Sequence, residues 1–343
     1  MNILAAIKKI SETHTDLNSQ EAAEVFDEIM SGEISEALIA SFLVALKMKG
    51  VCIAELAGAA SAVRKRAEFI NTGGRRAIDT CGTGGDGKDT FNISTTSAFI
   101  AAGAGACVAK HGGRAVSGKC GSADVLAQLG VDIDAHPAVM EHCLQEHGIA
   151  FLFAAKMHPA WKYAMPVRKL LGFRTVFNML GPLVNPAGVR GQVLGVYDAK
   201  LTELFAETLK RLGSKRALVV HSGDGMDEIS VSAPTRISEL KNGNVKTYEF
   251  RPESIIGATY PESDLKGGDA KTNAARMLGV LDNSDKSGGR EICLINAAAA
   301  LISAELAENF HTAYAMAKES LDSGKALEKL NRLIEFSQSN KDR

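Results

Sequence analysis

A glycine-dense, acidic loop at residues 82–87 constrains this chain more than any other segment, and it is called the glycine loop below. A strand is predicted before it, at residues 77–80, and a helix after it, at residues 95–102. The loop matches GxGxxG, but residues 102–107 hold no carboxylate for a dinucleotide's ribose, and no Gly-Lys-Ser/Thr makes it a P-loop. An Asp inside the loop would repel a pyrophosphate unless a cation bridged the two. Two interpretations stay open: a tight turn, or a backbone cradle for a diphosphate with Asp86 near its metal.

Two further loops suit a phosphate-rich ligand, because residues 90–123 contain no acidic side chain. Residues 92–95 place an amide and hydroxyls where the predicted helix begins, and helix N-termini bind anions. Ser and Thr there are also ordinary helix caps. The second loop follows a strand predicted at residues 106–110 and sets Lys110 and Arg114 among glycines. That pattern is typical of a phosphate site, and also of a solvated basic loop.

An acidic cluster follows another predicted strand. Asp227 and Glu228 are adjacent in a glycine-containing segment, residues 221–228. Magnesium binds through one or two carboxylates, keeps several waters and shares substrate phosphates. The pair therefore predicts a magnesium site, although two neighbouring carboxylates in a loop are often only solvated.

The chain is predicted to have two parts. Residues 1–72 show helical periodicity alone, and Asn18 with Glu21 has the spacing of a capping box. Residues 73–343 alternate strands and helices, which predicts the α/β class with a mostly parallel central sheet and helices on its faces. A helical segment near residues 165–181 is expected to pack on the N-terminal helices.

Composition narrows the possible partners and the compartment. A formal net charge of −1 over 343 residues argues against nucleic acid and acidic membranes as partners. The six cysteines are scattered without a CxxC pair, which favours reduced thiols in the cytoplasm. No signal peptide or membrane span is apparent, so a soluble, cytoplasmic protein is predicted.

Together these motifs, with residues 166–168 and 178–183, resemble those of the anthranilate phosphoribosyltransferase family over about residues 1–335. The resemblance implies a helical domain joined to a larger α/β domain, with the site in the cleft between them. It also implies a homodimer formed through the helical domain. The implied reaction joins phosphoribosyl pyrophosphate and anthranilate, with Mg²⁺, to give N-(5-phosphoribosyl)anthranilate and pyrophosphate in tryptophan biosynthesis.

The resemblance also assigns roles to individual residues. The diphosphate would contact Gly82, Gly85 and Asp86, and Mg²⁺ would be held by Ser94, Asp227 and Glu228. The phosphoribosyl part would contact Thr90, Asn92, Ile93, Ser94 and Thr95. The same site would be completed by Lys110, His111, Gly112, Gly113, Arg114, Ala115, Val116, Ser117, Gly118 and Ser122. Gly82 and Arg168 would place anthranilate, and Arg168 has a guanidinium that can clamp a carboxylate, although a surface helix of mixed charge shows the same pattern.

One position departs from the family. Gly113 stands where the family usually has an Asn that touches anthranilate, so acceptor binding is expected to be weaker, differently arranged or adapted to another aromatic amine. The sequence offers no clear general base, and a neutral aromatic amine of low basicity requires none. Two alternatives stay open: a nucleoside phosphorylase of the same fold, and a non-catalytic nucleic-acid-binding relative.

Overall fold

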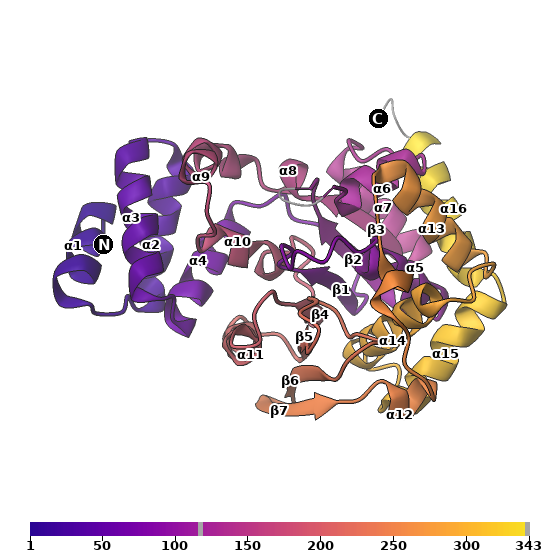
Figure 1. The fold of residues 1–343 in the computed structure, drawn as a ribbon. Helices are drawn as coiled ribbons and strands as arrows, with labels where there is room; N and C mark the ends of the chain where they lie inside the picture. Colours follow the sequence, from indigo (N-terminus) through magenta and orange to yellow (C-terminus); the bar gives the residue numbers. More distant parts are fainter. Residues whose placement is uncertain (116–118, 340–343) are drawn as a thin grey trace.

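The computed structural model describes residues 1–115 and 119–339. Four helices form the N-terminal part: α1 (Ile3–Thr13), α2 (Ser19–Ser31), α3 (Glu36–Lys49) and α4 (Ile53–Lys65). The predicted capping box starts α2, because the Asn18 side chain accepts from the Glu21 amide and Glu21 accepts from the Asn18 amide. These helices lie at one end of the molecule, opposite α15 and α16 (Figure 1).

The prediction of one continuous helix near residues 165–181 is wrong. Two short helices, α9 (Met165–Leu171) and α10 (Phe177–Leu180), replace it. Gly172 ends α9 in the left-handed conformation, at φ +64°, which favours glycine and stops a helix. Phe177 of α10 packs against Phe26 of α2, with ring centroids 5.6 Å apart. This segment therefore contacts the N-terminal helices.

Seven strands form one sheet in the order β3-β2-β1-β4-β5-β6-β7. The first five are parallel, as the alternation of strands and helices predicts, and β6 and β7 add an antiparallel hairpin. The hairpin turns at Asn242 and Gly243, both at positive φ. The strands are β1 (Ala77–Gly82), β2 (Cys107–Gly112), β3 (Ile149–Phe153), β4 (Gly191–Gly195), β5 (Arg216–Ser222), β6 (Thr235–Lys241) and β7 (Asn244–Phe250).

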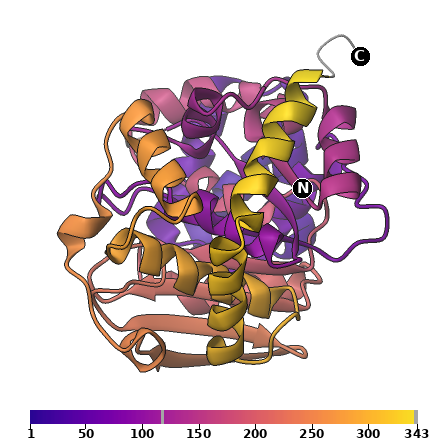
Figure 2. The same cartoon turned by 90° about the vertical axis from the view of Figure 1, so that its right-hand side faces the viewer.

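Helices cover both faces of this sheet (Figure 1). Figure 2 shows the C-terminal helices α15 and α16 crossing the α/β part on the side turned to the viewer. Four of these helices, α7, α8, α12 and α15, were not predicted from the sequence. The helices are α5 (Ile93–Gly103), α6 (Ser122–Gln128), α7 (Pro137–His147), α8 (Ala154–Met157), α11 (Leu201–Arg211), α12 (Glu253–Ile256), α13 (Ala270–Leu281), α14 (Gly288–Ser303), α15 (Phe310–Asp322) and α16 (Lys325–Ser339), with 3-10 turns at Pro159–Tyr163, Gly181–Leu183 and Glu262–Leu265.

Two buried cores result. One lies between the sheet and α5, α14 and their neighbours. The other runs from the N-terminal helices through Phe177 to Leu194 and Phe205, on the α11 side of the sheet. The N-terminal helices thus share a core with the sheet, which sets their position relative to the strand ends. Within the described residues, no helix is long and apolar enough to cross a membrane.

Candidate active site

The candidate site lies at the carboxyl ends of the parallel strands, where the strand order reverses. The chain runs from β1 outward to β2 and β3, then returns to β4 on the other side of β1. Ligands of open α/β sheets bind in the crevice at such a switch point. The glycine loop leaves β1, a second loop leaves β2, and the acidic segment leaves β5, so the topology brings the predicted motifs together.

The glycine loop is anchored by hydrogen bonds from two of its backbone amides, yet it leaves several amides available. Thr83 N donates to Gly195 O at 2.8 Å, and Gly84 N donates to Asp227 Oδ2 at 2.9 Å. A Cβ on Gly82 would lie 2.5 Å from the same carboxylate oxygen, so glycine is needed there for the close approach. Across the described residues, the amides of Gly85, Asp86 and Gly87 donate to no protein atom. Such free amides form an anion-binding concavity.

Three carboxylates face this cradle. Asp227 N donates to Asp86 Oδ2 at 3.4 Å, and Ser94 N donates to Glu228 Oε1 at 3.1 Å. Burial, and then the charge of Asp86, raises the pKa of Asp227 to about 7. Burial, and then the charge of Asp227, raises the pKa of Glu228 well above its usual value. Like charges held together and away from water favour either protons or a bound cation.

Lys110 lies on β2 beneath these carboxylates and is 3% exposed. Its ammonium donates to Thr80 O and to Ser94 Oγ, the latter at 3.4 Å, and it forms no ion pair within the described chain. Burial lowers the pKa of Lys110. A buried cation without a carboxylate partner is suited to an anionic ligand.

The donor set fits Mg²⁺. Carboxylate and hydroxyl oxygens of Asp227, Glu228 and Ser94 are hard ligands beside free amides for phosphate. Among the described residues, these acids do not form a group whose ligand atoms all lie within 4.8 Å of one another. Mg²⁺ commonly keeps waters and substrate phosphates as ligands and needs only one or two protein carboxylates.

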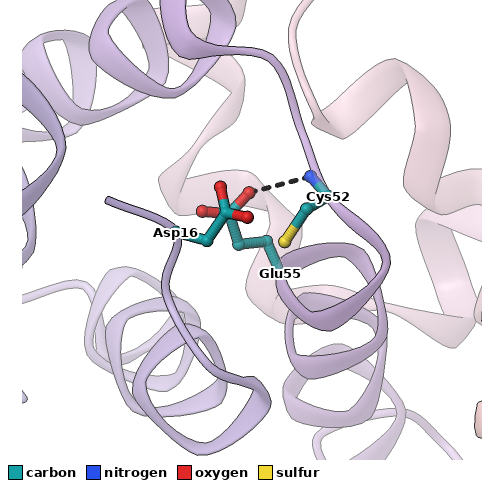
Figure 3. Close-up of side chains that lie close together, drawn as sticks. All are labelled: Asp16, Cys52 and Glu55. Atoms are coloured by element: carbon teal, nitrogen blue, oxygen red, sulfur yellow. Dashed lines mark hydrogen bonds between the residues drawn. The ribbon is translucent and has the colours of Figure 1, made fainter. Parts of the chain in front are cut away.

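Asp16, Cys52 and Glu55 do meet that distance criterion, far away in the helical part (Figure 3). Lys49 already neutralises this cluster, with Nζ 2.5 Å from Asp16 Oδ1 and 3.0 Å from Glu55 Oε2. Glu55 also accepts from the Leu17 and Cys52 amides, both at 2.9 Å. The cluster therefore connects the N-terminal helices through a shared lysine.

In the loop after β2, Arg114 and Ala115 contact the Asp124 carboxylate. Arg114 is exposed, and its Nη1 pairs with Asp124 Oδ1 at 2.9 Å. Ala115 N donates to the same carboxylate at 3.0 Å. Asp124 is the first acidic residue after the acid-free residues 90–123. Arg114 is therefore paired with a carboxylate in this structure, and its predicted contact with the phosphoribosyl part stays a prediction. Val116, Ser117 and Gly118, also predicted to bind substrate, lie outside the described residues.

Gly112, Gly113 and Ser122 do lie at the site edge. Ser122 Oγ donates to Gly113 O at 3.4 Å, and a Cβ on Gly112 would meet that hydroxyl at 2.2 Å. A Cβ on Gly113 would meet nothing within 4 Å. The position where an Asn was expected is therefore open space.

The helix start differs from prediction. Asn92 is the N-cap and α5 begins at Ile93, so Ser94 and Thr95 lie in its first turn and do not cap it. The Asn92 side chain donates to Cys120 O at 3.4 Å and accepts from Asn273 Nδ2 at 3.0 Å. The Ile93 and Thr95 side chains are buried in the structure. Thr90 forms an isolated bridge with Lys266.

A cluster of packed rings, His111, His158 and Trp161, lies near the end of β2, and most of it was not predicted from the sequence. His111 Nδ1 lies 3.2 Å from Gly181 O. The His158 ring packs edge-on against His111 at 5.0 Å and stacks on Trp161 at 5.1 Å. Among the described residues, His111 Nε2, Trp161 Nε1 and the His158 ring nitrogens are buried without a hydrogen bond of normal geometry, although the Val184 backbone lies close enough to His158 to favour its protonated form. Buried polar atoms are nearly always satisfied, so four orphans together indicate a ligand.

Arg168 lies beside this cluster of rings. Its guanidinium is 5.9 Å from the Trp161 ring centroid and 5.5 Å from that of Phe177. It makes no ion pair with any described residue, and burial lowers its pKa. The sequence signal for the missed side chains was the single Trp of the chain, close after His158.

Comparison with known proteins identifies the family. The helical bundle domain of a glycosyl transferase family matches residues 4–67, and its a/b domain matches residues 74–327. Anthranilate phosphoribosyltransferase of Desulfatibacillum aliphaticivorans is 52% identical over 325 residues, which cover 95% of this chain and 96% of that protein. This chain belongs to the anthranilate phosphoribosyltransferase family.

Solved structures of anthranilate phosphoribosyltransferases agree. The enzyme of Thermus thermophilus superposes with a TM-score of 0.92 at 40% identity, over 97% of this chain and 99% of that one. The Saccharomyces cerevisiae enzyme in complex with PRPP and Mg superposes with a TM-score of 0.87 at 27% identity, over 98% of each chain. The predicted family and the predicted fold, a helical part plus an α/β part with a mostly parallel sheet, are confirmed.

Proposed function

We propose that this protein transfers the phosphoribosyl group of phosphoribosyl pyrophosphate to anthranilate, releasing pyrophosphate, in tryptophan biosynthesis. One observation carries the proposal: the free amides of the glycine loop face Asp86, Asp227 and Glu228, next to a cluster of rings with orphaned nitrogens. Relatives about half identical over nearly the whole chain bear the name of that activity.

In the proposed mechanism, bound Mg²⁺ would neutralise charge on the leaving diphosphate. Asp227, Glu228 and Ser94 hold that ion, and Asp86 holds the loop against Asp227. The amides of Gly85 and its neighbours donate to diphosphate oxygens, and Lys110 adds positive charge where negative charge develops. Positive charge grows on the ribose ring as the bond to diphosphate breaks, as in glycoside cleavage. No general base is needed, and catalysis is mostly positioning.

The acceptor lies beside the cluster of rings that includes His111. Arg168 binds the anthranilate carboxylate, since its guanidinium has no other anionic partner in the described chain. His158 and Trp161 contact the aromatic ring and supply the orphaned nitrogens. The neutral His111 ring orients the amine. Gly113 leaves room beside the acceptor, which supports a wider range of aromatic amines.

The remaining predicted residues surround the ribose phosphate. We assign Thr90, Asn92, Ile93, Thr95, Gly112 and Ser122 by their place at the start of α5 and near the end of β2. The assignment of residues 114–118 rests on the resemblance alone. In the first turn of α5, the Thr95 amide has no partner among the described residues and is available for phosphate, whereas the Ile93 and Ser94 amides already donate to Phe91 O and Glu228 Oε1.

We also propose a homodimer formed through the helical part. A groove of about 580 Å³ lies between α1 and α3, lined by apolar side chains such as Ile7, Val44 and Met48. Met48 is 83% exposed and Leu4 50% exposed. A second copy would cover this face. Sedimentation of the wild type and of Met48→Glu tests it, and a monomeric wild type at micromolar concentration would refute it.

The chain division and location belong to the same proposal. Residues 1–72, with the segment near 165–181, form one part, and residues 73–343 form the other. The packing of Phe177 on Phe26 supports this division. The cytoplasmic location is supported by six cysteines without a disulfide between described residues.

The decisive experiment follows the loss of anthranilate fluorescence with phosphoribosyl pyrophosphate, with Mg²⁺ and with chelator. Consumption that needs Mg²⁺ supports the proposal. Phosphate-dependent nucleoside cleavage unaffected by chelator would favour the phosphorylase instead. Salt-dependent DNA binding without turnover would favour the nucleic-acid-binding relative.

A further inference from the structure

We infer that Arg174 is a positioning residue that holds the diphosphate-binding face of the glycine loop in place. This inference rests on the proposed function. Arg174 lies between α9 and α10, outside every motif used above, and its Nη2 donates to the carbonyl oxygen of Gly85. In the described residues its guanidinium has no carboxylate partner. Its charge is therefore directed at a backbone carbonyl of the loop.

The orientation of the Gly85 carbonyl fixes the orientation of the Asp86 amide, one of the proposed diphosphate donors. A trans peptide unit is planar, so its carbonyl and the following amide point in opposite directions. No described peptide bond is cis. When Arg174 holds the Gly85 carbonyl on one side, the Asp86 amide must point to the other. That amide has no protein partner among the described residues and is one of the proposed diphosphate donors.

The contact is close enough to constrain the loop. Gly85 has φ +77°, and a Cβ built on it would lie 3.0 Å from Arg174 Nη2 and 3.4 Å from Nε. The guanidinium thus lies against the glycine backbone where a side chain would be. A loop of consecutive glycines has many accessible conformations. A charge-assisted hydrogen bond that selects one of them lowers the entropy lost when the ligand binds.

Arg174 is itself held from two directions. Its guanidinium carbon lies 4.1 Å from the centroid of the Tyr197 ring, in the connection after β4. Tyr197 N donates to Thr83 Oγ1 at 3.2 Å, so the same residue also anchors the start of the loop. Lys47 of α3 donates to Arg174 O at 2.9 Å and lies 5.1 Å from the Phe173 ring centroid. A continuous set of contacts therefore joins the helical part to the glycine loop.

Amide hydrogen exchange without substrate, combined with steady-state kinetics, tests this role. Arg174→Met keeps the aliphatic stem and removes the donor. Its glycine-loop amides should exchange faster than in wild type, and the KM for phosphoribosyl pyrophosphate should rise about tenfold. The KM for anthranilate should change by less than about twofold, since Arg174 acts through the loop.

Three further variants separate the explanations. Arg174→Lys keeps the charge but cannot stack and donate as a planar fork, so it should recover little. Tyr197→Leu should produce a weaker form of the same defect, because it removes the ring on which Arg174 stacks but keeps the Arg174 guanidinium. The matched control Lys169→Met removes an exposed cation of α9 and should leave exchange and both KM values at wild-type levels.

Two results would overturn the inference. One is wild-type loop exchange and wild-type KM for phosphoribosyl pyrophosphate in Arg174→Met. The other is lost activity with wild-type loop exchange and a silent Tyr197→Leu, which would mean that Arg174 binds diphosphate directly. The exchange measurement needs no turnover. A wild type that consumes no anthranilate would therefore refute the proposed function while the exchange data still decide the role of Arg174.

Discussion

His158 is buried between His111 and Trp161, and among the described residues neither ring nitrogen has a hydrogen bond of normal geometry. Burial, and then the neighbouring His111, lowers the pKa of His158 from 6.5 to about 2. The unfolded chain therefore binds a proton below its ordinary pKa, while the folded chain does not. Folding stability is complete at higher pH and decreases as the pH falls from about 6.5 toward about 2.

The size of this effect follows from linkage. Between about pH 7.5 and about pH 5.5, one histidine of ordinary unfolded pKa that stays neutral when folded destabilises the protein by about 1.4 kcal/mol. Replacing it with a ring that cannot titrate should remove that contribution. In His158→Phe, the loss of unfolding free energy over this interval should be smaller by about 1.4 kcal/mol. Burial also lowers the pKa of His111, so His111 still contributes to the pH dependence of the unfolding free energy in this variant.

Urea unfolding at several pH values measures this difference. Trp161 is the only tryptophan, so its fluorescence reports on the unfolding of this cluster of rings. The control His311→Gln changes an exposed histidine on α15 and should show the wild-type pH dependence. Equal pH dependence in wild type and His158→Phe would refute the reasoning, because His158 would then be protonated or hydrated when folded.

Four further predictions concern the site. Asp227→Asn combined with Glu228→Gln should cut turnover by at least about 100-fold while far-UV circular dichroism stays unchanged; unchanged turnover would remove the metal assignment. Gly113→Asn should lower the KM for anthranilate, since a Cβ there meets nothing within 4 Å, and a KM that does not fall would show compensation elsewhere. Gly82→Ala should weaken Mg²⁺ binding in calorimetry, because its Cβ would lie 2.5 Å from Asp227 Oδ2; wild-type affinity would mean that the carboxylate can shift. Asp224→Asn should reduce both thermal stability and Mg²⁺ affinity, because that carboxylate accepts from the Ser222 and Ser230 hydroxyls and fixes the acidic segment; an unchanged melting temperature would contradict this.

Local chemistry made much of the fold predictable. The capping box of Asn18 and Glu21, the hairpin turn at Asn242 and Gly243, and the alternation of strands and helices depend on neighbours within a few residues. The broken helix at Gly172 was also present as a local signal, since a glycine that stops a helix needs no distant partner. Helices α7 and α15 were missed although each begins with a local cap, at His136 and at Asn309.

By itself, the sequence determined the fold class, the family and the motifs that could hold a diphosphate and a divalent cation. Only the tertiary structure decided which side chains meet. Arg114 and Arg174 look alike as basic loop residues, yet one pairs with Asp124 and the other donates to Gly85. His158 stacks within a cluster of rings whose members come from separate segments. The physical reason is that charge pairing and burial depend on distance in space, whereas caps, turns and periodicity depend on distance along the chain.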